Sequence, residues 1–176
     1  MSNITTYYGH SFNPTTAVTE DIDIRDIAHS LSLLCRAGGH LPHFYSVAQH
    51  CLNCLQEAKA RGYSKRVQLG CLLHDASEAY LSDITRPVKE CLPEYRQFEE
   101  KLQTLIYAKW LSPALTSDEE QQVFQIDDAL LYHEFLALTG KALFNNVPLL
   151  QSKPQLAFVD FEEAEKQFLQ AFTTLV

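Results

Sequence analysis

The sequence predicts an all-α fold, a single helical bundle of about six helices with a short irregular N-terminal arm. Apolar residues recur at helical spacing in several segments, as they do on one face of a helix. Capping-box patterns begin three of these segments, and sustained strand-like alternation is missing. With 176 residues, 46% of them hydrophobic, the chain is long enough for one domain with a substantial core. We expect one domain over residues 1–176, with its core at 23–140.

The first residues are expected to form an arm and then a helix. Residues 1–20 mix Thr, Tyr, Gly, Asn and Pro, a composition that predicts an irregular arm with room for a short hairpin. The first helix is expected from about Asp23 to Arg36, because apolar residues keep helical spacing there and Gly38-Gly39 then supplies a stop.

The second and third helices follow closely. The second is expected to start at Ser46, where Gln49 completes a capping box, and to end at residues 61–62. Ser64 is the expected cap of the third helix, which we extend to about Leu81.

A loop and three more helices complete the predicted bundle. Residues 83–87 are expected to form the loop, because Pro87 disfavours helical conformation at Arg86. The remaining helices are expected over Pro93–Trp110, from Ser117 to Gly140, and from the cap Asp160 to about Thr174. Glu120 and Glu163 would complete capping boxes at the last two.

Composition restricts the kind of partner. A net charge of −8 argues against a protein that coats nucleic acid, because duplex affinity comes largely from Lys and Arg side chains. No stretch approaches the ~20 apolar residues of a membrane span. The first residues also lack the basic and apolar regions of a signal peptide. We expect a cytoplasmic protein without membrane or nucleic-acid partners.

The five cysteines are odd in number and lie mostly in apolar helical context, which predicts reduced, buried thiols. Cys51 and Cys54 have CxxC spacing, but neither a second CxxC nor a preceding strand accompanies them. We interpret this pair as structural rather than as a zinc or redox motif.

The most informative stretch is Leu69–Asp83, an apolar helical run that contains the pair His74-Asp75. Burying an ionised carboxylate without a partner costs several kcal/mol, so Asp75 needs a cation nearby. His74 is a ready metal ligand, and on a helix the two side chains point about 100° apart. One ion can therefore meet both.

Other helices supply further ligand candidates, since a transition-metal ion needs more than two. His50 lies inside the second helix, and Asp127 and Asp128 are adjacent in the fifth. Each alone would be interpreted as a hydrogen-bonded core residue. One shared cation, however, accounts for polar residues inside all three apolar helices. Asp127 is preferred because it shares a helical face with Glu134, although periodicity leaves Asp128 open.

The order His50, His74-Asp75, Asp127 resembles the HD-domain superfamily of metal-dependent phosphohydrolases, over roughly residues 23–138. The run from His74-Asp75 through Glu78 to Asp83, followed by Pro87-Val88-Lys89, is similar to one branch of it. That branch contains bacterial 5′-deoxynucleotidases and small phage dNTP triphosphohydrolases. Ala37 and Gln49 depart from the Trp and Glu that are common there.

The resemblance implies roles for individual residues. One divalent metal cation (Mn, Co, Zn, Fe, Ni or Mg) would be bound by His50, His74, Asp75 and Asp127. Glu78 and Asp83 would be catalytic and assist the attacking water, and Arg36 would contact the substrate phosphate. By position alone, His40, Arg86 and Lys89 are further candidates for substrate contact.

The expected function is hydrolysis of a phosphoester of a small-molecule nucleotide, a deoxynucleoside 5′-monophosphate or a dNTP. The alternative is a non-catalytic nucleotide-binding or regulatory module, against which the presence of Glu78, Asp83 and Arg36 argues. A two-iron redox enzyme would need further histidines after His74-Asp75, where only His133 follows.

Aromatic residues persist on the late helices, beyond what short helices obviously need to bury. They are Tyr107, Trp110, Phe135, Phe168 and Phe172. Exposed apolar patches usually mark interfaces, so we expect a homo-oligomer, in its simplest form a dimer.

Overall fold

Helices make up almost all of the regular structure in residues 3–176, the part of the chain that the computed structural model describes. The elements are β1 (Ile4–Thr5), β2 (Ser11–Phe12), the 3₁₀ helix η1 (Thr19–Asp21), α1 (Ile24–Leu33), the 3₁₀ helix η2 (Arg36–Gly39), α2 (Val47–Ala60), α3 (Lys65–Leu73), α4 (Glu78–Leu81), α5 (Arg86–Lys89), α6 (Pro93–Trp110), α7 (Ser117–Thr139) and α8 (Phe161–Leu175). The predicted all-α fold class is confirmed, and β1 and β2 pair as a small antiparallel hairpin in the arm.

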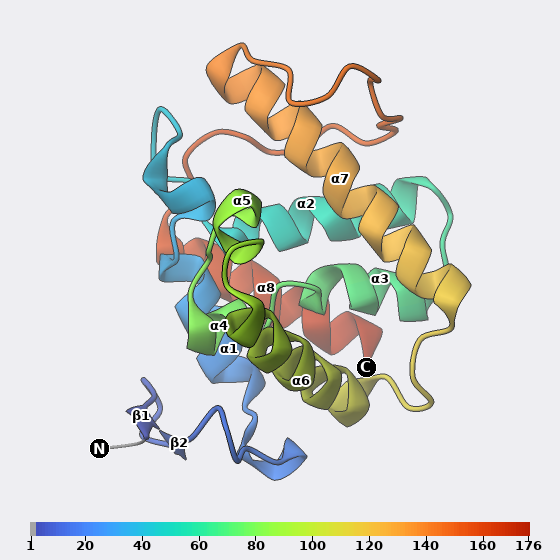
Figure 1. Cartoon of the computed structure of the whole chain (residues 1–176). Helices are drawn as coiled ribbons and strands as arrows, with labels where there is room; N and C mark the ends of the chain where they lie inside the picture. The colour runs from blue at the N-terminus through green and yellow to red at the C-terminus, as the bar shows by residue number, and fades with distance from the viewer. Residues whose placement is uncertain (1–2) are drawn as a thin grey trace.

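Helix α2 lies in the middle of the bundle (Figure 1), where it contacts α1, α3, α7 and α8. The core consists of large apolar side chains from all five helices. They include Ile27, Leu31, Leu55, Leu72, Ile126 and Phe168. Burying a side chain of this size contributes ~1.5–3 kcal/mol. This packing fixes α2, α3 and α7 relative to one another, and these helices carry the predicted metal ligands.

The aromatic residues of α8 face this core. Phe168 is 0% exposed and Phe172 8% exposed, and Trp110 meets Phe172 edge to face with ring centroids 5.2 Å apart. Phe168 and Phe172 are thus covered within one chain, whereas Tyr107, Trp110 and Phe135 are half-buried. Large apolar side chains are exposed elsewhere, on α7 and after it, for example at Phe124 and Val147. A homo-oligomer stays a prediction.

Several helix ends lie where capping chemistry predicted them. Ser46 and Gln49 form the expected capping box at α2, and Asp160 caps α8. The cap of α7 is Thr116 rather than Ser117: its side chain and that of Glu119 exchange hydrogen bonds with each other's backbone N–H groups. Arg66 also binds Glu119, at 3.1 Å, and this helps to select Glu119 over its neighbour.

The predicted third helix is not continuous. It breaks after Leu73 and resumes as α4 at Glu78. Gln103, from α6, inserts at the break: its Nε2 donates to the carbonyl of Leu73 at 2.8 Å, and its Oε1 accepts from the N–H of Ser77 at 3.1 Å. These bonds take over the polar groups that an interrupted helix leaves unpaired. The break contains His74 and Asp75.

The loop predicted over residues 83–87 is shorter than expected, because residues 86–89 form the single-turn helix α5. Pro87 lies in the first turn of this helix, where its missing N–H is not needed. Proline disfavours helical conformation in the residue before it, but here that residue, Arg86, is the first residue of the helical turn. This preference therefore did not predict α5.

Residues 148–158, which we call the strap, run along α2 without helical structure. Four polar residues at i, i+4 spacing on α2 hold its main chain. They are Gln49, Asn53, Glu57 and Arg61, which bond respectively to the backbone of Ala157, of Gln155, of Gln151 and Ser152, and of Leu149. The strap is thereby fixed through its backbone.

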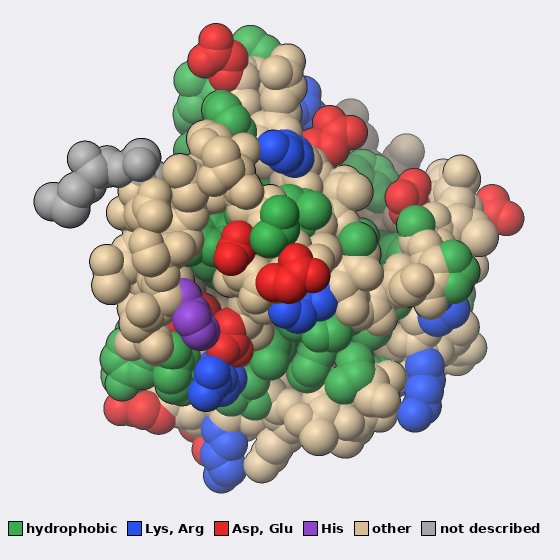
Figure 2. Space-filling model, turned by 90° about the horizontal axis from the view of Figure 1, so that it is seen from below, with side chains coloured by type: hydrophobic (Ala, Val, Ile, Leu, Met, Phe, Trp, Pro, Cys, Tyr) green, Lys and Arg blue, Asp and Glu red, His purple; other side chains and the backbone are tan. Residues whose placement is uncertain are grey.

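No helix in the described part of the chain is long and apolar enough to cross a membrane. The face of the molecule in Figure 2 mixes acidic, basic and apolar side chains, and no continuous basic area covers the described residues there.

Candidate metal centre

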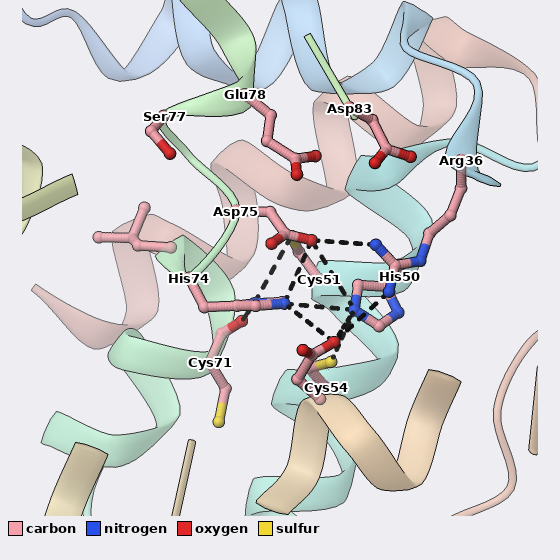
Figure 3. Close-up of polar contacts among 12 residues, drawn as sticks. Arg36, His50, Cys51, Cys54, Cys71, His74, Asp75, Ser77, Glu78 and Asp83 are labelled. Atoms are coloured by element: carbon pink, nitrogen blue, oxygen red, sulfur yellow. Dashed lines mark hydrogen bonds and ion pairs between the residues drawn. The ribbon is translucent and has the colours of Figure 1, made fainter. Parts of the chain in front are cut away.

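Three parts of the bundle bring four predicted ligands together. His50 comes from α2, His74 and Asp75 from the break after α3 (Figure 3), and Asp127 from α7. Nε2 of His50 lies 3.2 Å from Nε2 of His74 and 3.1 Å from an oxygen of Asp127. Nε2 of His74 lies 3.2 Å from an oxygen of Asp75. Ligand atoms that share one ion at ~2.1 Å lie about 3–3.5 Å apart, so this spacing fits a coordination shell.

The other ring nitrogens fix which nitrogen of each histidine carries the proton. Nδ1 of His50 lies 2.9 and 3.0 Å from the two oxygens of Glu134, and Nδ1 of His74 lies 2.8 Å from the carbonyl oxygen of Cys71. A carboxylate and a carbonyl only accept, so each Nδ1 donates a proton. In the neutral rings both Nε2 atoms then present lone pairs, which repel at 3.2 Å unless a cation lies between them.

The charges around the histidines also favour a cation. Arg36 is surrounded by three carboxylates, at 3.1 Å from Asp75, 3.4 Å from Asp127 and 3.5 Å from Glu134. With both histidines neutral, the single charge of Arg36 cannot balance three carboxylates, even though the half-exposed Arg86 also lies 3.5 Å from Asp127. The site therefore keeps an excess of negative charge that a cation would neutralise.

The pKa values of these groups also favour positive charge at the site. Burial alone would raise the pKa of Asp75 and of Asp127, but the neighbouring histidines hold both below the usual range. Burial alone would lower the pKa of His74, yet Asp75 raises it well above the usual value. The group thus stabilises positive charge on or between the imidazoles.

Asp127 and Asp128, which the sequence leaves as alternatives, have different partners. An oxygen of Asp127 lies 3.1 Å from Nε2 of His50, whereas an oxygen of Asp128 lies 2.9 Å from Nη2 of Arg86. The structure therefore brings Asp127 to the histidines.

Asp83 supports the turn that carries Arg36. The residue after Arg36, Ala37, has a φ of 57°, in the left-handed region that is unfavourable for a residue with a Cβ. The carboxylate of Asp83 accepts a hydrogen bond of 2.8 Å from the Ala37 N–H. This contact holds the turn in the conformation that aims Arg36 at Asp75 and Asp127.

Glu78 is the first residue of α4 and is only 3% exposed. One of its oxygens lies 3.0 Å from Nζ of Lys89, and the other has no hydrogen-bond partner among the described residues. Burial together with Asp75 and Asp83 raises the pKa of Glu78 well above its usual range. Its carboxyl group points to the same side of the site as that of Asp83 (Figure 3). A buried carboxyl group with one open oxygen is suited to holding or delivering a proton.

The other predicted substrate contacts lie at different distances from the centre. Lys89 pairs with Glu99 as well as with Glu78. Arg86 lies 3.5 Å from Asp127. His40 is exposed at the end of η2.

A cleft of about 610 Å³ opens beside the four converging residues, within the size range of small-molecule sites. His74, Asp75 and Asp127 line one part of it. The rest is lined chiefly by α6 and by Lys89, and includes Arg96, Gln97 and Gln103. The contribution of α6 was not predicted from the sequence. Helix α6 gives the cleft one basic side chain, Arg96, and two acidic ones, Glu99 and Glu100, while Lys89 comes from α5.

The chain resembles known proteins over most of its length, although no protein-family model matches it. It is 36% identical to YfdR of Escherichia coli over 160 residues, which cover 85% of this chain and 87% of YfdR. The chain belongs to the YfdR family. It is also 37% identical over 101 residues to RCAP_rcc00048 of Rhodobacter capsulatus, covering 54% of this chain and 51% of that protein. Both relatives are named as uncharacterized proteins, so they lend this chain no activity.

In this member of the YfdR family, a second layer of residues around His50 escaped the sequence analysis. Glu134 is 1% exposed and accepts from His50 and, at 2.7 Å, from the hydroxyl of Tyr45. Asn53 in turn donates to Tyr45 at 2.7 Å. The shared helical face of Asp127 and Glu134 was the available signal. It placed Glu134 near the site without showing which ligand it orients.

The cysteines were also interpreted too simply. All five thiols are free, as predicted, but Cys91 is exposed and Cys35 is half-buried. Cys54 lies with its Sγ 3.5 Å from Nε2 of His50. The buried group of His50, Cys54 and His74 could therefore hold a metal ion. The available signal was spacing, because Cys54 follows His50 by one helical turn.

Proposed function

We propose that this protein is a metal-dependent phosphohydrolase that cleaves a phosphoester of a nucleotide, a deoxynucleoside 5′-monophosphate or a dNTP. The observation that carries the proposal is the pair of Nε2 atoms of His50 and His74, 3.2 Å apart with both Nδ1 atoms already donating. A shared cation accounts for this arrangement. Three further features support phosphoester hydrolysis. They are an excess of negative charge around the histidines, the buried carboxyl group of Glu78, and a cleft that contains Lys89 and Arg96.

A divalent cation, when bound, lowers the pKa of its water and polarises a phosphate oxygen. The protein residues perform the other tasks. Burial together with Asp75 and Asp83 raises the pKa of Glu78, and this suits its carboxyl group to protonate the leaving oxygen or to orient the attacking water. Asp83 acts through Ala37 by fixing the turn that carries Arg36.

Positive charge for the phosphate comes from two places. Lys89 and Arg96 line the cleft and would meet a phosphate that enters it. Arg36 is 8% exposed and already faces three carboxylates, so its first role is to balance charge within the site. A direct phosphate contact by Arg36 stays a prediction.

The test is a substrate screen. Purified protein would be stripped with a chelator, reloaded separately with Mn, Co, Zn, Ni, Fe or Mg, and given nucleoside and deoxynucleoside mono-, di- and triphosphates. Separating the products shows whether orthophosphate or triphosphate is released. His74→Ala, with its fold checked by circular dichroism, is the control for contaminating phosphatase. If folded, metal-loaded protein binds nucleotides but releases no phosphate from any of them, the chain is a binding module and the hydrolase proposal fails.

A further inference from the structure

We propose that Cys54 is itself a ligand of the cation, so that a thiolate joins the two imidazoles and the site selects a thiophilic transition ion such as zinc, cobalt or iron. This inference rests on the metal centre of the proposed function and adds a residue and a metal class to it. Thiolates favour such ions over magnesium and manganese, which prefer oxygen ligands.

The position of the sulfur is the first argument. Sγ of Cys54 lies 3.5 Å from Nε2 of His50, the ring nitrogen that faces the other ligands. A zinc ion bound to nitrogen at ~2.1 Å and to sulfur at ~2.3 Å, at a tetrahedral angle, separates the two atoms by ~3.6 Å. The ligand atoms of His50, Cys54 and His74 also lie within 4.8 Å of one another. The thiol therefore lies where a ligand would lie.

The neighbouring residue Cys51 is placed less well than Cys54 to bind the same ion. Cys51 lies close to His74 and Asp75, but its Sγ is 4.0 Å from Nδ1 of His74. That nitrogen already donates to the carbonyl oxygen of Cys71, so it has no lone pair to share with an ion. Cys54 is the cysteine whose sulfur contacts an Nε2 atom.

Helix geometry explains how two ligands come from α2. Cys54 follows His50 by four residues, so both side chains leave the helix on the same side, one turn apart. Cys54 is 1% exposed and His50 is 0% exposed, so this side of the ion would be closed to water. The cleft lies against His74, Asp75 and Asp127, which leaves the substrate side open.

Cobalt provides the test, because a cobalt–thiolate bond gives a charge-transfer absorption band in the near ultraviolet that nitrogen and oxygen ligands do not give. Wild-type protein, Cys54→Ser and Cys51→Ser would be loaded with Co²⁺, and bound cobalt would be measured by elemental analysis. We expect the band in wild type and in Cys51→Ser, and its loss in Cys54→Ser that still binds cobalt. The preference for zinc over manganese should fall in the same variant.

X-ray absorption of zinc-loaded wild-type protein provides a measurement that needs no variant, and one sulfur neighbour at ~2.3 Å is expected. Stoichiometric cobalt or zinc without a sulfur signal would overturn the role of Cys54 and leave the metal centre intact. A band that disappears in Cys51→Ser instead would assign the thiolate to the other cysteine. Failure of wild type to bind any of these ions would reject the metal centre itself.

Discussion

The Nε2 atoms of His50 and His74 lie 3.2 Å apart, closer than two neutral imidazoles approach without a proton or an ion between them. Their other nitrogens are held by Glu134 and by the carbonyl of Cys71. The contact thus joins α2 to the break after α3, and hydrogen bonds on the far side of each ring hold it in place. The contact is explained if the two imidazoles share an ion, and that explanation can be tested.

Removing one of the two imidazoles should abolish metal binding. His74→Ala leaves His50 without its partner and breaks the shell of ligands, so the variant should bind no stoichiometric metal and show no metal-dependent activity. The unfolding temperature of wild type should rise when metal is added, because a ligand at 100 times its Kd stabilises the folded state by ~2.7 kcal/mol. A His74→Ala protein with unchanged metal content would place the ion elsewhere.

Glu134→Gln should weaken metal binding without removing any ligand. The carboxylate orients His50 and raises its basicity, and loss of such a partner typically costs 10–100-fold in metal affinity. Isothermal titration with Zn²⁺ or Mn²⁺ would measure the change. Glu57→Gln is the matched control, since Glu57 is another fully buried carboxylate on the bundle but holds the strap. Equal effects of the two variants would reduce Glu134 to a structural role.

The contribution of Glu57 to stability should depend on pH. Burial alone would raise the pKa of Glu57, but hydrogen bonds from Ser152 and Arg61 lower it below the usual value. A lowered folded-state pKa stabilises the protein above the unfolded-state pKa of about 4.3, and this stabilisation is lost as pH falls through the folded-state value.

Glu57→Gln should therefore cost about 1.5–3 kcal/mol at pH 7, with a smaller difference from wild type below about pH 4. Urea unfolding at several pH values measures this. The exposed residue Glu120 offers the control variant Glu120→Gln. A deficit that does not change with pH would mean that the charge of Glu57 is unimportant.

Glu78→Gln should keep metal and substrate binding and lose turnover. An amide can neither give up nor take the proton that a carboxyl group with a raised pKa can transfer, and positioned acid–base groups contribute ~10²–10⁴-fold. Steady-state kinetics on the nucleotide identified by the screen would be run with metal content measured in parallel. Near-wild-type kcat would mean that Glu78 has only a structural role, through its hydrogen bond with Lys89.

Variants of Arg36 and Arg96 should distinguish the balance of charge within the site from the binding of substrate. Arg96→Gln removes a cation from the cleft wall, so KM should rise while metal affinity is unchanged. Arg36→Gln uncovers three carboxylates, so metal affinity should change, and KM too if Arg36 reaches the phosphate. A metal affinity unaffected by Arg36→Gln would contradict the charge balance described above.

Local chemistry predicted much of the fold, and long-range contacts determined the rest. Helix α6 has the predicted bounds Pro93–Trp110, because proline in a first turn and helical periodicity are local signals. The break at His74 depends on Gln103, which is distant in sequence and reaches the break only in the folded bundle. A sequence pattern therefore extended the third helix through it.

The candidate site was also predicted in part from local sequence signals, and the rest depends on long-range contacts. The order of His50, His74-Asp75 and Asp127 along the chain indicates a shared ion by itself, since each is a polar residue in an apolar helical run. The second-layer contact of Glu134 with His50 joins α7 to α2, and no local pattern contains that pairing.

The strap is held by its main chain, and this has a consequence for how the family can vary. The hydrogen bonds to the strap all end on its backbone atoms; they come from Gln49, Asn53, Glu57 and Arg61. We therefore expect that substitutions of outward-facing strap side chains leave these hydrogen bonds to α2 unchanged. The exception is proline, which cannot replace Gln151, Ser152 or Gln155, because their N–H groups are donors. The prolines present, Pro148 and Pro154, avoid those positions. The outward side chains of the strap can thus vary without changing the hydrogen bonds that hold it to α2.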